Sequence, residues 1–196
     1  MKLFRMAALV AALTFATAAF AADHVSKHGF HVDLPDDWSV ADIDAMIARH
    51  KAADPNWVPT PDAMTLTDPK IEVYQYQGSR EAIIVSKEPE MAPTSLALIK
   101  QICDDTRATI TATPGAGLPK CEARTIDGVH FMAYQMTLND KWTLQAALPT
   151  ADGHTLLVVG GADATTRAAV EAMHERVVQA GIAQFLQARK GAASAK

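Results

Sequence analysis

Three consecutive residues near the amino end have the types and the order of a metal-binding terminus. Ala22, Asp23 and His24 directly follow a hydrophobic segment. If that segment is removed, the free amine of Ala22, two backbone amides and the His24 imidazole can form a square-planar set, which suits Cu(II) or Ni(II). His28 and His31 are near enough in sequence to add ligands. The alternative is that histidine stands at this position by chance.

The segment before these residues has the pattern of a secretory signal peptide. Lys2 and Arg5 give it a positive start, residues 6–20 are almost all apolar, and Ala19-Phe20-Ala21 supplies the small residues that signal peptidase recognises. We therefore expect residues 1–21 to be removed and the protein to act in the periplasm or outside the cell. Cleavage one residue later would place histidine second and destroy the metal site.

Two cysteines, Cys103 and Cys121, are the only ones in the chain. In an oxidising compartment a single pair is more often a disulfide than two free thiols. A redox or metal-binding pair is the alternative, but the spacing is not C-x-x-C and neither cysteine has a histidine beside it. We expect a structural disulfide.

Composition argues against a nucleic-acid or membrane-surface partner. The 196 residues carry a net charge of −4, and the two charged residues of the leader are both basic, so the processed chain would be more acidic still. Nucleic acids and anionic membranes select basic patches. The size fits one domain with a substantial core.

A proline-rich stretch at 52–70 is the candidate partner-binding loop. It has no clear period and contains Trp57, Val58 and Pro59. Proline lowers the ordering cost on binding, and an exposed tryptophan is a frequent hot-spot residue. Alternatively, Trp57 folds back against the edge of the core.

Other groups that could carry chemistry are better explained by structure. His130, Met132 and Met136 share a strand face and could hold Cu(I), but a hydrophobic core face is the more frequent use of such a row. His174 is expected to be a partly buried structural residue. No nucleophile motif is present, so an enzyme would need a site built from scattered residues.

Periodicity predicts one antiparallel sheet with helices. Strands are expected at 30–34, 38–40, 71–76, 82–86, 122–126, 129–138, 142–149 and 154–160, and helices at 42–50, 95–111 and 163–187. Leu156 to Val159 are apolar on both faces, so we expect helices on both sides of that strand.

Side-chain parity predicts one register. The row Met132, Tyr134, Met136 and the row beginning at Trp142 share a face only if Leu138 opposes Trp142. We therefore expect a three-residue loop at 139–141.

The chain resembles the PsbP-like superfamily, which includes the PsbP subunit of photosystem II and DcrB-type bacterial envelope proteins. The resemblance lies in Gly29-Phe30-His31-Val32-Asp33-Leu34-Pro35-Asp36-Asp37-Trp38, in the strands around Ile126-Asp127-Gly128-Val129 and at Leu156, and in the terminal helix. It implies an α/β/α sandwich and a binding or accessory role without a shared catalytic centre.

The sequence thus predicts a signal peptide at 1–21, an N-terminal tail at 22–29, one α+β domain at 30–187 and a disordered tail at 188–196. The predicted fold is a single antiparallel sheet flanked by helices on both faces. The predicted function is that of an exported, non-catalytic binding or accessory protein of the bacterial envelope, with another envelope protein as partner. The alternative is a periplasmic Cu(II) or Ni(II) binder that uses Ala22, Asp23 and His24.

Overall fold

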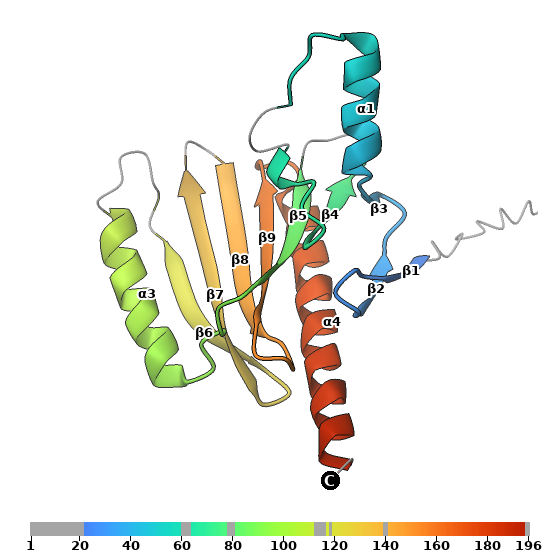
Figure 1. Cartoon of the computed structure of the whole chain (residues 1–196). Helices are drawn as coiled ribbons and strands as arrows, with labels where there is room; N and C mark the ends of the chain where they lie inside the picture. Colours follow the sequence, from blue (N-terminus) through green and yellow to red (C-terminus); the bar gives the residue numbers. More distant parts are fainter. Residues whose placement is uncertain are drawn as a thin grey trace, which may run out of the picture.

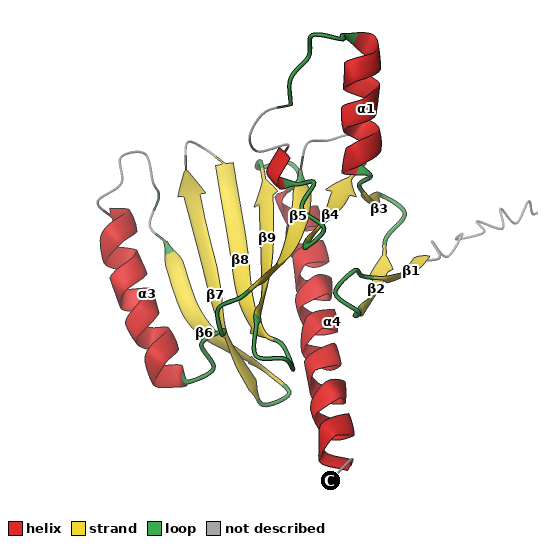
Figure 2. Ribbon diagram, viewed as in Figure 1, coloured by secondary structure: helices red, strands yellow, loops and turns green. Residues whose placement is uncertain are grey.

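A computed structural model describes residues 22–59, 64–77, 81–111, 117, 119–138 and 141–194. The strands are β1 (Ala22–Val25), β2 (His31–Leu34), β3 (Trp38–Val40), β4 (Ile71–Tyr76), β5 (Ala82–Glu88), β6 (Lys120–Ile126), β7 (Val129–Leu138), β8 (Lys141–Pro149) and β9 (Thr155–Ala162). The helices are α1 (Ile43–Ala53), α3 (Leu96–Thr111) and α4 (Arg167–Ser194). Figure 2 shows their arrangement. The predicted signal peptide lies outside the described residues.

Seven strands form one antiparallel sheet in the order β3-β4-β5-β9-β8-β7-β6. The first two strands pair with each other as a separate hairpin, β1-β2. This arrangement confirms the predicted α+β class with a large antiparallel sheet.

One face of the sheet is covered by α4 together with the β1-β2 hairpin. Leu156 and Val158 of β9 are buried beneath the helix, whose Val170, Met173 and Val177 follow helical spacing. Strand β2 also packs against α4, and its apolar residues belong to the same core. Both covering layers therefore share one hydrophobic core with the sheet (Figure 1).

The opposite face is covered less completely than we predicted. Leu157 and Val159 point to that side and are only half-buried. Helix α3 lies beside the edge strand β6 (Figure 1), and its close contacts are with β6 and β7. Within the described residues, a full helical layer on both faces is therefore not confirmed.

The predicted register of the β7-β8 hairpin is wrong. Leu138 pairs with Lys141, and Thr137, rather than Leu138, pairs with Trp142. The row of Met132 and Met136 consequently faces the α3 side, whereas the row of Trp142 faces α4. The prediction from side-chain parity was wrong because it assumed that the apolar rows of the two strands lie on the same face. This sheet carries apolar residues on both of its faces.

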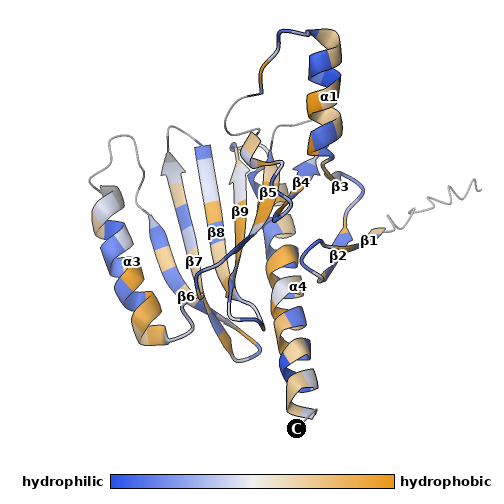
Figure 3. Cartoon of the chain, in the orientation of Figure 1, coloured by the Kyte–Doolittle hydropathy of each residue, from blue (hydrophilic) through white to orange (hydrophobic). Residues whose placement is uncertain are grey.

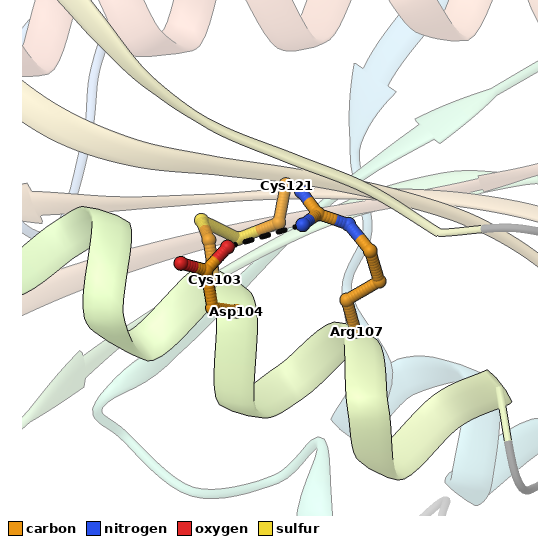
Figure 4. The surroundings of a disulfide bond; sticks show 4 residues. All are labelled: Cys103, Asp104, Arg107 and Cys121. Carbon is orange, nitrogen blue, oxygen red and sulfur yellow. Dashed lines mark hydrogen bonds and ion pairs between the residues drawn. A yellow bond between two sulfur atoms is a disulfide. The ribbon is translucent and has the colours of Figure 1, made fainter.

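The predicted disulfide between Cys103 of α3 and Cys121 of β6 is confirmed. Ile99 and Tyr134 pack around it in a small second hydrophobic cluster. Figure 4 shows the bond with the neighbouring Asp104–Arg107 ion pair of 3.1 Å. In the chain-entropy account, closing a separation of 18 residues stabilises the fold by about 3 kcal/mol.

Both predicted tails are ordered where the structure describes them. Residues 22–25, which we expected to be part of a free tail, form β1 and pair with β2. Helix α4, which we expected to end near Gln187, continues to Ser194. At the amino end, pairing with β2 overrides the short polar pattern on which the prediction depended. At the carboxyl end, the alanine, arginine and lysine residues favour helix strongly enough to continue it through Gly191. None of the helices in the described part has the length and apolar character needed to span a bilayer.

The glycine pair of β9 provides a test of the packing beneath α4. The strand that we predicted to end at residue 160 continues through Gly160 and Gly161 to Ala162. A Cβ added at Gly160 would lie 2.6 Å from Leu144 and 2.9 Å from Ile83, whereas one added at Gly161 meets nothing within 4 Å.

We predict that Gly160→Ala lowers the free energy of unfolding by about 1–3 kcal/mol, because the methyl group overpacks the core. Gly161→Ala is the matched control and should leave that free energy within about 0.5 kcal/mol. Urea unfolding of both variants measures the difference. Equal effects would contradict the close packing of Leu144 and Ile83 around Gly160.

Candidate functional site

The buried acidic group of the described chain is the carboxylate of Glu72 on β4. Glu72 is 2% exposed. His24 Nε2 donates to its Oε1 at 2.9 Å, and Tyr74 OH donates to its Oε2 at 2.8 Å. Ser26 Oγ also donates to Oε2, and the backbone N–H of Lys27 approaches Oε1 at 3.4 Å. A charge is thus buried with donors on both oxygens.

The residue types of this cluster are those of a serine–histidine–acid triad, but their order is different. In a triad the histidine lies between the hydroxyl and the acid and removes the proton from the hydroxyl. Here Glu72 lies between His24 and Ser26, and the serine hydroxyl is used as a donor to the carboxylate. The arrangement therefore binds the carboxylate and does not activate Ser26 as a nucleophile.

The surroundings of Glu72 favour its ionised form. Burial raises the pKa of Glu72, but the hydrogen bonds from Ser26, His24 and Tyr74 outweigh burial and hold the pKa below its usual value. Burial and the nearby carboxylate raise the pKa of Tyr74, so its hydroxyl stays protonated and able to donate.

The structural effect of Glu72 is to fasten the β1-β2 hairpin to the sheet. His24 and Ser26 belong to β1 and the turn that follows it, while Glu72 lies in the middle of the chain. The same turn is held by α4, where Gln184 Nε2 donates to the carbonyl of His28 at 2.8 Å. Gly29 closes the turn with a φ of 87°, a conformation that favours glycine.

A groove of about 350 Å³ opens next to this fastened turn. Its sides come from three separate parts of the chain: the hairpin turn, the β8-β9 turn with the end of β5, and the C-terminal half of α4 (Figure 1). Lys27, His28 and Lys87 supply nitrogen atoms, and Leu156 and Phe185 supply apolar surface. Such a mixture is typical of small-ligand sites.

His28 contributes a neutral ring to the groove. Its Nε2 donates to the carbonyl of Val85 at 3.4 Å, and the ring stacks on Phe30 with centroids 6.4 Å apart. Burial lowers the pKa of His28, and Lys87 and Lys27 lower it further. The positive charge at the groove therefore belongs to the two lysines.

A second groove, of about 550 Å³, lies between β6-β8 and the N-terminal half of α4. Its principal charges are already paired, because Arg124 contacts Glu175 at 2.9 and 3.1 Å. His174 also lines it. As predicted, this residue is a buried structural histidine: Nε2 donates to Val158 O at 3.2 Å, and burial lowers its pKa to about 4.

The structure separates the histidines that we expected near one metal ion. His24 contacts Glu72, His28 contacts Val85, and His31 lies 3.2 Å from Asp23 on the exposed side of the hairpin. Among the described residues there is no cluster of three His, Cys, Asp or Glu side chains suited to a metal. Copper or nickel binding by Ala22, Asp23 and His24 stays a prediction, and it would require His24 to leave Glu72.

The predicted partner-binding residues lie at the end of a projecting segment, Ile43–Pro59, which we call the arm. Trp57 stacks on His50 of α1, with ring centroids 4.8 Å apart, and belongs to neither hydrophobic core cluster. Val58 is 78% exposed. Trp57 therefore packs on its own arm and does not fill the core edge.

Helix α1 itself stands away from the sheet (Figure 1). It begins as predicted, with Asp42 accepting from the backbone N–H of Ala45 at 2.8 Å. None of its residues is buried, and it packs closely against no other helix or strand that the structure describes. Its ribbon nevertheless carries both apolar and hydrophilic residues (Figure 3).

The row considered for Cu(I) belongs to the second core cluster. Met132 and Met136 pack around the buried Tyr134, whose hydroxyl donates to Met136 Sδ at 3.3 Å. His130 shares a hydrogen bond of 2.8 Å with Thr125. This placement agrees with the core interpretation.

Comparisons with known proteins give a remote likeness in shape. No protein-family profile matches the chain, and no curated protein matches it. The solution structure of cyanobacterial PsbP from Synechocystis is similar over 87% of this chain and 96% of that chain, with 13% identity and a TM-score of 0.49. A likeness at this level does not assign the chain to a family.

We predict that Glu72→Gln lowers the free energy of unfolding by about 2 kcal/mol at pH 7, because charge-assisted hydrogen bonds to a buried carboxylate are lost. Since the folded-state pKa of Glu72 is lowered, its contribution is complete above about pH 4.5 and is lost as the pH falls through the folded-state pKa. The two proteins should therefore converge in acid.

Urea unfolding between pH 7 and pH 3 measures this difference. His174 destabilises both proteins below about pH 6.5, because its pKa is about 4 in the folded state, so only the difference between them reports on Glu72. Glu90→Gln, at an exposed glutamate, is the control and should follow the original protein at every pH. A gap that stays constant with pH would contradict the role of the Glu72 charge.

Proposed function

We propose that this chain is an exported, non-catalytic binding protein of the bacterial envelope, which contacts another envelope protein through the arm. The observation that carries the proposal is the state of α1: an 11-residue helix with no buried residue and no close packing partner among the described elements. Helices of this length are marginal by themselves, and most helices in proteins are stabilised by packing an apolar face. A partner would supply that packing.

The composition of the arm favours a protein partner. Ile43, Met46 and Ile47 of α1 are half-buried, and the half-buried Trp57 and exposed Val58 follow them. Aromatic and methionine side chains are enriched at protein interfaces, and the helix–turn arrangement presents them on one projecting element. The stacking of Trp57 on His50 already orders the ring, which reduces the entropy lost on binding.

Export is supported by the predicted signal peptide and by the Cys103–Cys121 disulfide, which an oxidising compartment maintains. We also propose that the chain belongs to the PsbP-like superfamily, with a complete α/β/α sandwich. This part of the proposal depends on the sequence resemblance at residues 29–38 and from Ile126 to the terminal helix. The order of Glu72, His24 and Ser26 supports a non-catalytic role, since the hydroxyl is bound to the acid.

We predict that a photo-crosslinking amino acid at position 58 forms a discrete adduct with one partner protein in cells that export the chain. The matched control is position 91, because Met91 is 80% exposed and Val58 is 78% exposed. Trp57→Ala should reduce the yield at position 58 about tenfold, as expected for a hot-spot residue.

The readout is the adduct mass and its identity by peptide mass spectrometry. Equal labelling at positions 58 and 91, or a yield unaffected by Trp57→Ala, would contradict the arm as the binding element. A reproducible turnover abolished by one substitution in the folded domain would contradict the non-catalytic role.

A further inference from the structure

The groove beside the hairpin turn is lined by both apolar and charged residues. Leu156 of β9 and Phe185 of α4 line it, and Pro149 and Ala188 extend the apolar surface. The volume of about 350 Å³ lies in the range of small-ligand sites. An aliphatic chain of several carbons fits such a space, and burying each methylene group would stabilise the complex.

Of the two lysines that line the groove, only one forms an ion pair with a described residue. Lys87 forms an ion pair with Asp152, which also accepts from Thr150 Oγ1 at 2.6 Å. Lys27 has no carboxylate partner within the part of the chain that the structure describes. Its ammonium donates to the carbonyl of Ile71 at 3.2 Å, which uses one of its three N–H groups. The carboxylate of the nearby Glu72 makes its side-chain hydrogen bonds with Ser26, His24 and Tyr74, and it forms no ion pair with Lys27.

We propose that the groove binds a small aliphatic monocarboxylate, with its carboxylate on Lys27 and its alkyl chain against Leu156 and Phe185. One ammonium without an ion-pair partner among the described residues matches one negative charge, and the other two charged residues of the groove, Lys87 and Asp152, pair with each other. A cationic ligand would be repelled by Lys27, and a polyanionic ligand would be repelled by Asp152. This site is separate from the arm, so it adds a small-molecule ligand to the proposed protein partner.

Isothermal titration of the processed protein with sodium octanoate tests the proposal. We expect one octanoate per chain with a dissociation constant of about 0.1 mM, a reasonable value for a ligand of ten non-hydrogen atoms. The uncharged probe 1-octanol has the same chain without the carboxylate and should bind at least about tenfold more weakly.

Two variants distinguish the contribution of the Lys27 charge to binding from the contribution of the cavity. Lys27→Met should weaken octanoate at least about tenfold and remove the preference for octanoate over 1-octanol, because it deletes the ammonium and keeps the backbone N–H that approaches Glu72. Ala188→Trp, at an exposed position of α4 that lines the groove, should fill the cavity and abolish binding of both probes. Lys100→Met, at an exposed lysine of α3, is the charge-matched control.

Each result decides the proposal. Absence of saturable octanoate binding up to about 5 mM would overturn it, as would binding that Ala188→Trp leaves unchanged. Equal affinity for octanoate and 1-octanol, or equal losses in Lys27→Met and Lys100→Met, would overturn the assignment of the carboxylate to Lys27. Circular dichroism of each variant establishes that the fold is retained.

Discussion

The amino-terminal half of the structure depends on the hydrogen bonds that surround the buried carboxylate of Glu72. A charge at 2% exposure destabilises a protein unless donors surround it, and here Ser26, His24 and Tyr74 supply them. An isolated hairpin of two four-residue strands is not stable in water. Glu72 and α4 together hold this hairpin in place, and thereby position Lys27 and His28 at the groove.

The fold then places the arm and the β8-β9 turn, which lines the groove, at opposite ends of the sheet (Figure 1). The arm projects at one end and presents apolar side chains without burying them, while the groove lies at the other end and encloses a small volume. The disulfide fixes α3 at the β6 edge, away from both. One antiparallel sheet thus separates the proposed protein-binding arm from the proposed small-molecule groove.

Local patterns predicted the elements well and the long-range contacts poorly. Strand β4, the Asp42 cap and the disulfide follow from alternation, capping chemistry and a single cysteine pair. The β7-β8 register could not be predicted from such patterns. When both faces of a sheet carry apolar rows, side-chain parity does not determine which face a given row occupies. The Glu72 cluster was missed because two of its donors, His24 and Ser26, lie 48 and 46 residues away in sequence. The available signal was a glutamate within the predicted strand 71–76, where a buried charge needs a partner.

Amide hydrogen exchange of the hairpin in the processed protein tests the central claim most directly. The account predicts that amides paired between β1 and β2 are protected in the original protein. In Glu72→Ala they should lose protection selectively, while amides of β7 and β8 keep theirs. Rapid exchange of the hairpin in the original protein, or protection unchanged by Glu72→Ala, would contradict the claim that this carboxylate holds the hairpin on the sheet.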